Sequence, residues 1–227
     1  EAVELARAVG HPFSEALSLV YAACLYFYRR EPAAAQRWAE QGIEVSAKQG
    51  LLWWLALGTI LRGWALAQQG RADEGAPQIR FCLDRMRAMG TELSRSNFLS
   101  MLAEAHHAMG KSEEALACLS EAVDLLEKRG DRSYEASLVY HTKGVLLLAL
   151  SDPRRLEAEQ CFERALRIAR DQNARSPQLR AALDLARLRA ERDPAGAREL
   201  LREALRGFAD ATETEELLEA RALLARV

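Results

Sequence analysis

Glycine recurs along this chain at a fixed interval that favours a repeating pair of helices. Four glycines stand forty residues apart and two more fall midway within the series: Gly10, Gly50, Gly90 and Gly130, then Gly70 and Gly110. Glycine is favoured just past the C-terminal end of a helix because it adopts the left-handed conformation without strain. A glycine at about every twentieth residue therefore predicts alternating helices and tight turns, with a repeat of about forty residues.

A second pattern, small–large–small, recurs with nearly the same period. Its three residues are spaced by four and then by three, which places them on one face of a helix. Small outer residues allow a neighbouring helix to approach closely, and the central residue, usually bulky and apolar, fills the groove. The instances are Ala35-Ala39-Gly42, Gly75-Ile79-Cys82, Ala115-Leu119-Ala122, Ala158-Phe162-Ala165 and Ala197-Leu201-Ala204.

Together the two patterns predict an all-α chain of about five helix pairs with single helices at its ends. The pairs are expected over residues 12–49, 51–89, 92–129, 132–172 and 177–209, followed by a capping helix over 214–226. Residues 1–9 are expected to end a second helix whose partner is missing, so we expect residues 1–227 to form one repeat domain from a longer array. Ser176-Pro177 is expected to cap one helix, and Thr212 with Glu215 has capping-box spacing for the last.

The second-helix triplets resemble the tetratricopeptide motif, in which Ala, a bulky residue and Ala recur at this spacing. Gly63, Ala103 and Gly144 stand where that motif has its small first-helix residue, and Gly70 and Gly110 match its turn glycine. The repeat is longer here, about forty residues against roughly thirty-four. The resemblance implies a right-handed α–α superhelix whose first helices line a concave face that binds peptides or partner segments.

The C-terminal part of the chain is similar to one particular group of such proteins. The runs 158–170 and 176–188 and the closing helix 214–226 resemble the last repeats of bacterial multidomain signalling regulators. In that group an adenylate or guanylate cyclase, kinase or DNA-binding domain precedes a signal-transduction ATPase and a tetratricopeptide tail. The resemblance implies a regulatory role for this chain, with the enzymatic domains outside it.

Composition argues against several other classes of protein. Lys and Arg number 31 against 33 Asp and Glu, so no global field attracts the chain to nucleic acid or an anionic membrane. The most apolar stretch, 51–66, is interrupted by Gly58 and Arg62 and is too short to span a bilayer. The cysteines lie singly in apolar helix patterns and are expected to be thiols in a reducing cytosol: Cys24, Cys82, Cys118 and Cys161. We therefore expect a cytoplasmic protein that contacts neither nucleic acid nor membrane directly.

No set of residues indicates catalysis, so we expect no catalytic residue, no metal and no cofactor. The sequence has no phosphate-cradling glycine loop of the form G-x-x-x-x-G-K-[ST]. It also has neither the G-x-S-x-G motif of serine hydrolases nor the H-E-x-x-H motif of zinc proteases. His107 and His141 could approach each other on neighbouring first helices, but a metal site would need further ligands. Acidic pairs such as Glu113-Glu114 stand at helix starts, where they complement the helix dipole.

Aromatic residues gather in the first part of the chain and are candidates for binding. Nine of the fifteen lie at or before residue 64, and neighbours such as Trp53 and Trp54 cannot both face one core. Aromatic side chains are favoured anchors in interfaces and ligand pockets. The concave-face positions of the tetratricopeptide family, carried over to this sequence, select six binding residues: Phe27, Trp64, Asn97, Glu104, His107 and His141.

These features lead to three hypotheses of function. The first is a non-catalytic regulatory or scaffold module, whose concave groove binds a protein or peptide and relays a signal to effector domains. That partner could be another domain of the same parent protein. The second is a superhelical domain that senses a small-molecule inducer, which predicts an enclosed apolar pocket under the N-terminal aromatics. The third is a self-association scaffold, such as a homodimer, in which exposed aromatics pair two chains.

Overall fold

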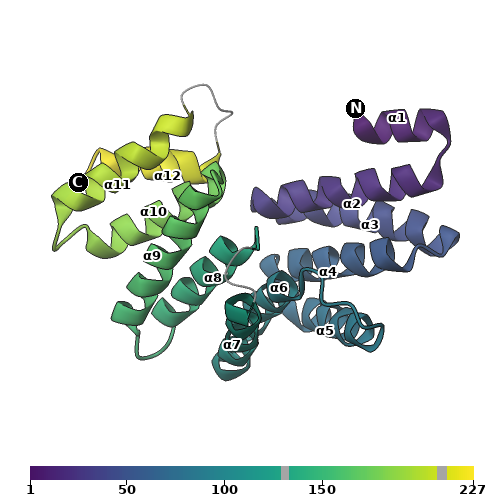
Figure 1. Ribbon diagram of the computed structural model, residues 1–227, viewed down its shortest axis with the longest axis horizontal. Coiled ribbons are helices and arrows are strands. Elements are labelled where there is room, and N and C mark those ends of the chain that lie inside the picture. Colours follow the sequence, from purple (N-terminus) through teal and green to yellow (C-terminus); the bar gives the residue numbers. More distant parts are fainter. Residues whose placement is uncertain (129–132, 209–213) are drawn as a thin grey trace. The chain divides into compact units, whose positions relative to one another are not determined.

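The computed structural model describes residues 1–128, 133–208 and 214–227, and every regular element within them is a helix (Figure 1). The predicted all-α superhelical repeat fold is confirmed. The chain divides into two compact units, Glu1–Cys118 and Leu119–Val227. The boundary falls inside helix α7 (Ser112–Lys128), which contributes residues to both units.

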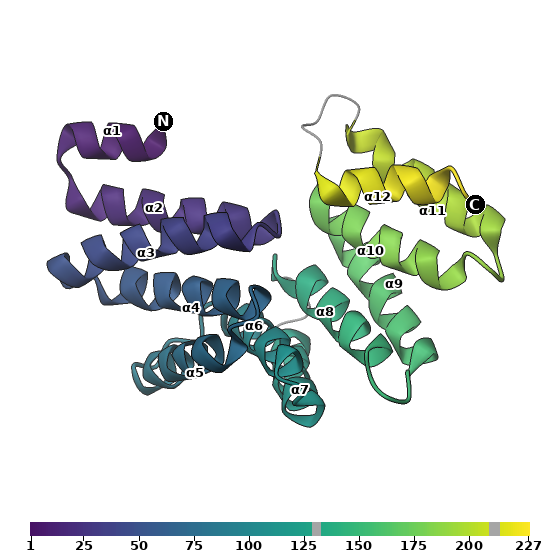
Figure 2. The same ribbon diagram turned by 180° about the vertical axis from the view of Figure 1, so that it is seen from behind.

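The first unit is a stack of helices joined by short turns. Figures 1 and 2 show its helices α1 to α5 side by side, with consecutive helices running in opposite directions. Their bounds, with that of the helix that follows, are α1 (Ala2–Val9), α2 (Pro12–Tyr28), α3 (Pro32–Gln49), α4 (Leu52–Gln68), α5 (Ala72–Ala88) and α6 (Arg95–Ala108). The first helices of the predicted pairs are therefore α2, α4 and α6.

The second unit continues the same alternation after α7. Its helices are α8 (Ala136–Leu148), α9 (Arg155–Asp171), α10 (Arg175–Arg189), α11 (Pro194–Leu205), a 3-10 turn (Arg206–Phe208) and α12 (Glu215–Leu224). The first helices here are α8 and α10, and α12 packs against both α10 and α11. Its buried side chains, Leu217 and Ala220, cover the end of this stack.

The glycine turns occur as predicted wherever the structure describes them. Gly10 and Gly50 end α1 and α3 in the left-handed conformation, with φ of 67° at each. Gly70, Gly90 and Gly110 also have positive φ, between 72° and 82°. Gly130, the remaining member of the series, lies outside the described residues.

Two predicted helix caps differ from the structure. α10 begins at Arg175 with Ala174 before it, so Ser176 lies inside the first turn and the prediction that it caps the helix was wrong. Proline is tolerated throughout a first turn, whose N–H groups have no partner within the helix, so Pro177 does not fix the starting residue. Thr212 lies outside the described residues, and Thr214 caps α12 by accepting a hydrogen bond from the Leu217 N–H.

The small–large–small triplets lie at contacts between helices, as their pattern predicts. The central residues Ile79, Leu119, Phe162 and Leu201 are fully buried. The closest approach joins α4 and α5, where a Cβ added to Gly75 would lie 2.1 Å from the Gly63 carbonyl oxygen. Only glycine fits at such a contact, so this pair of small residues holds the two helices together at that point.

Candidate functional site

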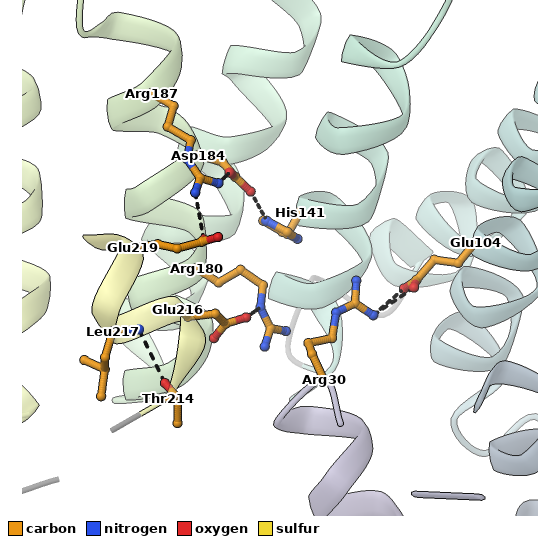
Figure 3. A network of polar contacts seen from close by, with 10 residues as sticks. All are labelled: Arg30, Glu104, His141, Arg180, Asp184, Arg187, Thr214, Glu216, Leu217 and Glu219. Carbon is orange, nitrogen blue, oxygen red and sulfur yellow. Dashed lines mark hydrogen bonds and ion pairs between the residues drawn. The ribbon is translucent and has the colours of Figure 1, made fainter. Parts of the chain in front are cut away.

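The first helices of the first unit meet around one carboxylate, that of Glu104 on α6. Its Oε2 accepts hydrogen bonds from the Trp64 indole at 3.0 Å and the Gln68 amide at 3.0 Å, both on α4. The Arg30 guanidinium, just past the end of α2, donates to the same oxygen at 2.8 Å (Figure 3). The Glu104 side chain on α6 therefore links three successive first helices, because its donors lie on α4 and directly after the end of α2.

Two of the predicted binding residues lie underneath this carboxylate. The Trp64 ring is fully buried, and Phe27 packs edge-on against it with ring centroids 4.8 Å apart. The Arg30 guanidinium carbon lies 5.6 Å from the Trp64 ring centroid, a cation–π distance. Both rings are covered by neighbouring side chains, so they support the Glu104 carboxylate from below. A binding role for Phe27 and Trp64 stays a prediction.

The second unit contains a similar chain of polar contacts among α8, α10 and α12. His141 on α8 places its Nε2 2.8 Å from Asp184 Oδ2 on α10, and Asp184 Oδ1 accepts from Arg187 at 2.9 Å. Arg187 in turn donates to Glu219 on α12 at 2.7 Å (Figure 3). Burial alone raises the pKa of Asp184, but the hydrogen bond from His141 and the Arg187 charge outweigh it and lower that pKa. The carboxylate is therefore ionised, and the proton in the His141 contact lies on Nε2.

Most of these contacts share one orientation along the chain. The donor lies on one first helix or immediately after it, and the carboxylate lies on a later helix of the same unit; the Arg187–Asp184 pair, within α10, is the exception. The Arg180 guanidinium, which is buried, follows this rule by donating to Glu216 on α12 at 2.5 Å. Three of the contacts tie helices together at sequence separations near one repeat: Trp64–Glu104 at 40 residues, His141–Asp184 at 43 and Arg180–Glu216 at 36.

The other predicted binding residues are not brought into this network. Asn97 is buried, and its Oδ1 has no hydrogen-bond partner among the described residues. His107 is half-buried at the end of α6. His141, in contrast, is buried and held by Asp184. Direct contact with a partner stays a prediction for Glu104 and His107, whose side chains are partly accessible.

The structure also shows exposed apolar residues that the carry-over from the family did not select. Phe13 and Tyr21 on α2 both contact Trp54 on α4, with ring centroids 5.8 and 5.7 Å apart. Tyr21 and Leu25 are each 56% exposed, and Phe13 is 44% exposed. We call Phe13, Tyr21 and Leu25 the α2 patch. The clustering of aromatics at the start of the sequence was its only signal, because periodicity alone does not tell which face of α2 is uncovered.

Burial raises the pKa of three of the four thiols, those of Cys24, Cys82 and Cys161. The pKa of Cys24 rises to about 12 and that of Cys82 to about 11. A thiol with a raised pKa is a poor nucleophile at neutral pH. Among the described residues, no group of three or more His, Cys, Asp or Glu side chains is arranged to hold a metal ion. None of the described helices combines the length and apolar character needed to cross a membrane.

Comparison with known proteins supports the fold but identifies no family. No protein-family model matches the sequence, and no curated protein matches it. The chain is similar in structure to BtubC (BKLC) from P. vanneervenii, with a TM-score of 0.62, 20% identity and coverage of 94% of this chain and 92% of that one. It is also similar to a kinesin light chain-like protein of Podosopora anserina with nearly identical TPR-like repeats. That match has a TM-score of 0.55, 20% identity and coverage of 95% of this chain and 97% of the other. The chain thus has the fold of tetratricopeptide-like repeat proteins.

Proposed function

We propose that this chain is a non-catalytic module that binds a protein or peptide partner through the first helices of its first unit. The observation that carries the proposal is the α2 patch, in which Phe13, Tyr21 and Leu25 stand exposed on one helix. Rigid aromatic side chains that are half-exposed contribute much contact area at small entropic cost. The Glu104 carboxylate and His107 lie on α6 of the same unit and would supply polar contacts.

A regulatory role follows from the ties between first helices. A partner that competes with Gln68 or Arg30 for the Glu104 carboxylate would loosen the contacts between successive helices of the first unit. Contacts in repeat arrays are mainly between neighbours, so such a change alters the stacking of the array. The resemblance of runs 158–170 and 176–188 to bacterial signalling regulators supports a cytoplasmic role in which this change reaches effector domains of a larger protein.

Site-specific photocrosslinking tests the proposal. A photoreactive phenylalanine analogue placed at Tyr21 should crosslink one discrete partner, which mass spectrometry would identify. The matched control carries the same group at Leu156, an exposed residue of α9 in the second unit. Crosslinking at Tyr21 no stronger than at Leu156 would contradict a binding role for the α2 patch.

Self-association is a second candidate, and one comparison between repeats favours it. Leu61 and Ala65, forty residues after Tyr21 and Leu25, are fully buried. α4 packs against both α2 and α6, whereas the equivalent residues of α2 form an exposed face. A second copy covering this face would bury it in the same way. Light scattering would then show a dimer that the substitutions Tyr21→Glu and Leu25→Glu convert to a monomer, and an already monomeric protein would exclude this candidate.

The inducer-sensing alternative receives less support from the described residues. That hypothesis predicted an enclosed apolar pocket under the N-terminal aromatics. An apolar cavity does occur in the first unit, but it lies between α4 and α5 and is bordered by the exposed Phe81. A thermal shift with a metabolite library would still detect an inducer.

A further inference from the structure

A cavity opens between α4 and α5 at some distance from their tight contact. The helices touch at Gly63 and Gly75, and a cavity of about 310 Å³ lies between the first half of α4 and the second half of α5. This volume is at the lower end of the range for ligand pockets, roughly 300–1,000 Å³. Its walls include Leu52, Leu55, Thr59, Phe81, Arg85 and Met89. We call it the α4–α5 groove.

Large apolar side chains at the rim of this groove are exposed. Phe81 is 63% exposed, Leu52 61% and Met89 54%. Single exposed apolar residues are ordinary, but three of them around one cavity form a contiguous apolar surface of the kind that marks binding sites. The α4–α5 groove is therefore a candidate docking surface distinct from the α2 patch, whose residues do not line it.

The preceding repeat shows that the fold does not require apolar residues at this place. Forty residues before Leu52, Leu55, Phe81 and Met89 stand Pro12, Glu15, Gln41 and Gln49. Those residues line a second cavity, next to α1, where the charges pair with one another. Arg7 binds Glu15 at 2.9 Å and Lys48 binds Glu44 at 2.6 Å. The equivalent place is thus polar and charge-balanced in one repeat and apolar in the next, so helix packing alone does not account for Phe81 and Met89.

The charge at the α4–α5 groove is positive and unbalanced. The Arg85 guanidinium carbon lies 5.9 Å from the Phe81 ring centroid, and within the described part of the chain Arg85 forms no ion pair. The amino-terminal end of α4 lies at the same groove, since Leu52 is its first residue. Its N-cap, Leu51, has no side chain that could accept from the first-turn N–H groups, so the positive end of the helix dipole is not neutralised there.

We propose that the α4–α5 groove binds a short acidic, apolar segment of a partner protein. A bulky apolar side chain of that segment packs between Phe81 and Met89, and a neighbouring Asp or Glu carboxylate pairs with Arg85. The inference rests on the proposed function, that of a module that binds proteins, and adds the chemistry of one partner segment. A guanidinium beside an apolar surface is suited to a carboxylate because a charge-assisted bond gains strength where water is excluded.

Selection from a displayed library of random twelve-residue peptides tests the inference on the whole chain. The counter-selection uses the double variant Phe81→Gln and Met89→Gln, which gives the groove the residues of the preceding repeat, Gln41 and Gln49. Both substituted side chains are mostly exposed, so circular dichroism melting should match that of the unaltered protein. We expect the selected peptides to combine a large apolar residue with Asp or Glu.

A synthetic peptide from this selection then separates the apolar from the charged contribution. Fluorescence polarisation should show at least tenfold weaker binding to the double glutamine variant. Arg85→Glu should reverse the preference, so that a copy of the peptide with Lys in place of Asp and Glu binds better than the original. The control variant Gln49→Ala, at the equivalent place in the preceding repeat, should bind as the unaltered protein does.

Several results would overturn the inference. Failure of the library to yield a binder, selected peptides without enriched acidic residues, or equal binding by the double glutamine variant would each contradict it. A dimer in light scattering that the double glutamine variant converts to a monomer would assign the groove to a second copy instead. Crosslinking at Tyr21 is independent of these residues, so if it succeeds while the peptide test fails, the proposed function stands without this inference.

Discussion

The Glu104 carboxylate shows how a single, largely covered charge connects several helices. Its side chain is only 10% exposed, yet it accepts hydrogen bonds from Arg30, Trp64 and Gln68. An ionised group in such a place is stable only when donors surround it. The carboxylate is therefore a structural tie between helices, and its contact with a partner stays a prediction.

Glu104→Gln should lower the free energy of unfolding by about 1–3 kcal/mol, because a neutral amide replaces the charge that three donors share. Urea unfolding followed by circular dichroism measures this change. The control is Glu74→Gln, which breaks a half-exposed pair with Arg71 on the surface of α5. Surface pairs contribute about 0–1 kcal/mol, so an effect at Glu104 no larger than at Glu74 would contradict the role of a buried tie.

Asp184 adds a dependence on pH to the second unit. Burial raises the pKa of Asp184, but the hydrogen bond from His141 and the charge of Arg187 lower it by more, so the net shift of the pKa is downward. The unfolded chain then binds more protons at this group than the folded one does in acid. The ionised carboxylate therefore contributes stability above its unfolded pKa of about 3.9, and this contribution is lost as the pH falls through the folded value.

Asp184→Asn should remove this contribution. We expect the variant to be less stable than the unaltered protein at pH 7, by about 1–3 kcal/mol, and the difference to narrow as the pH falls below about 4. Urea unfolding at a series of pH values measures the difference. Asp152→Asn, at an exposed position between α8 and α9, is the control and should leave the profile unchanged. A difference that stays constant with pH would argue against an ionised, tied carboxylate.

At the scale of the helix, the sequence predicts well which segments form helices and predicts less well where each helix begins and ends. The glycine turns and small–large–small triplets mark where helices end and which face packs, because both depend on residue size and backbone conformation alone. The start of α6 was expected near residue 92 but lies at Arg95, since the sequence there offers no decisive cap. The buried position of Trp64 could not be foreseen from its own helix, because α4 is apolar nearly all round and neighbouring helices decide which face is covered.

The polar ties between helices carried a signal that periodicity of apolar residues does not reveal. Trp64 and Glu104 are separated by 40 residues, and His141 and Asp184 by 43. Complementary donors and acceptors about one repeat apart therefore stand opposite each other on successive first helices. A search of the sequence for such pairs would have found the Glu104 and Asp184 contacts, whereas the carry-over from shorter repeats did not reveal that Phe27 and Trp64 are buried.

Gly75→Ala should destabilise the α4–α5 pair by about 2 kcal/mol or more, because the added methyl group would lie 2.1 Å from the Gly63 carbonyl oxygen. Alanine also has the better helix propensity by about 1 kcal/mol, so a net loss identifies the steric clash as the cause. Gly110→Ala is the comparison, since its φ of 72° is strained for alanine while no atom lies within 4 Å. That change should cost only about 1–2 kcal/mol. A stable Gly75→Ala protein would show that the two helices separate freely.

At the scale of the whole molecule, two proteins can share a fold without sharing a sequence signature of a family. The structural neighbours are only 20% identical to this chain, and no protein-family model matches it. Helix-pair stacking requires small residues at a few contacts and a turn glycine, and it leaves the remaining positions free to vary. The sequence therefore predicts the class of fold from a small set of residues, while the proposed partner contacts lie at freely varying positions, those of the α2 patch and the α4–α5 groove.

The last helix allows a test of how far a local change spreads through such an array. Leu217 on α12 is buried against the helices before it, whereas its neighbour Leu218 is half-exposed. Leu217→Ala should cost about 2–4 kcal/mol locally, and Leu218→Ala should cost much less. Because contacts in repeat arrays run between neighbours, hydrogen exchange monitored by mass spectrometry should accelerate in α10, α11 and α12 of the Leu217 variant. Exchange in α2 to α5 should not change, and equal acceleration in both units would show that the chain unfolds as one cooperative body rather than from its end.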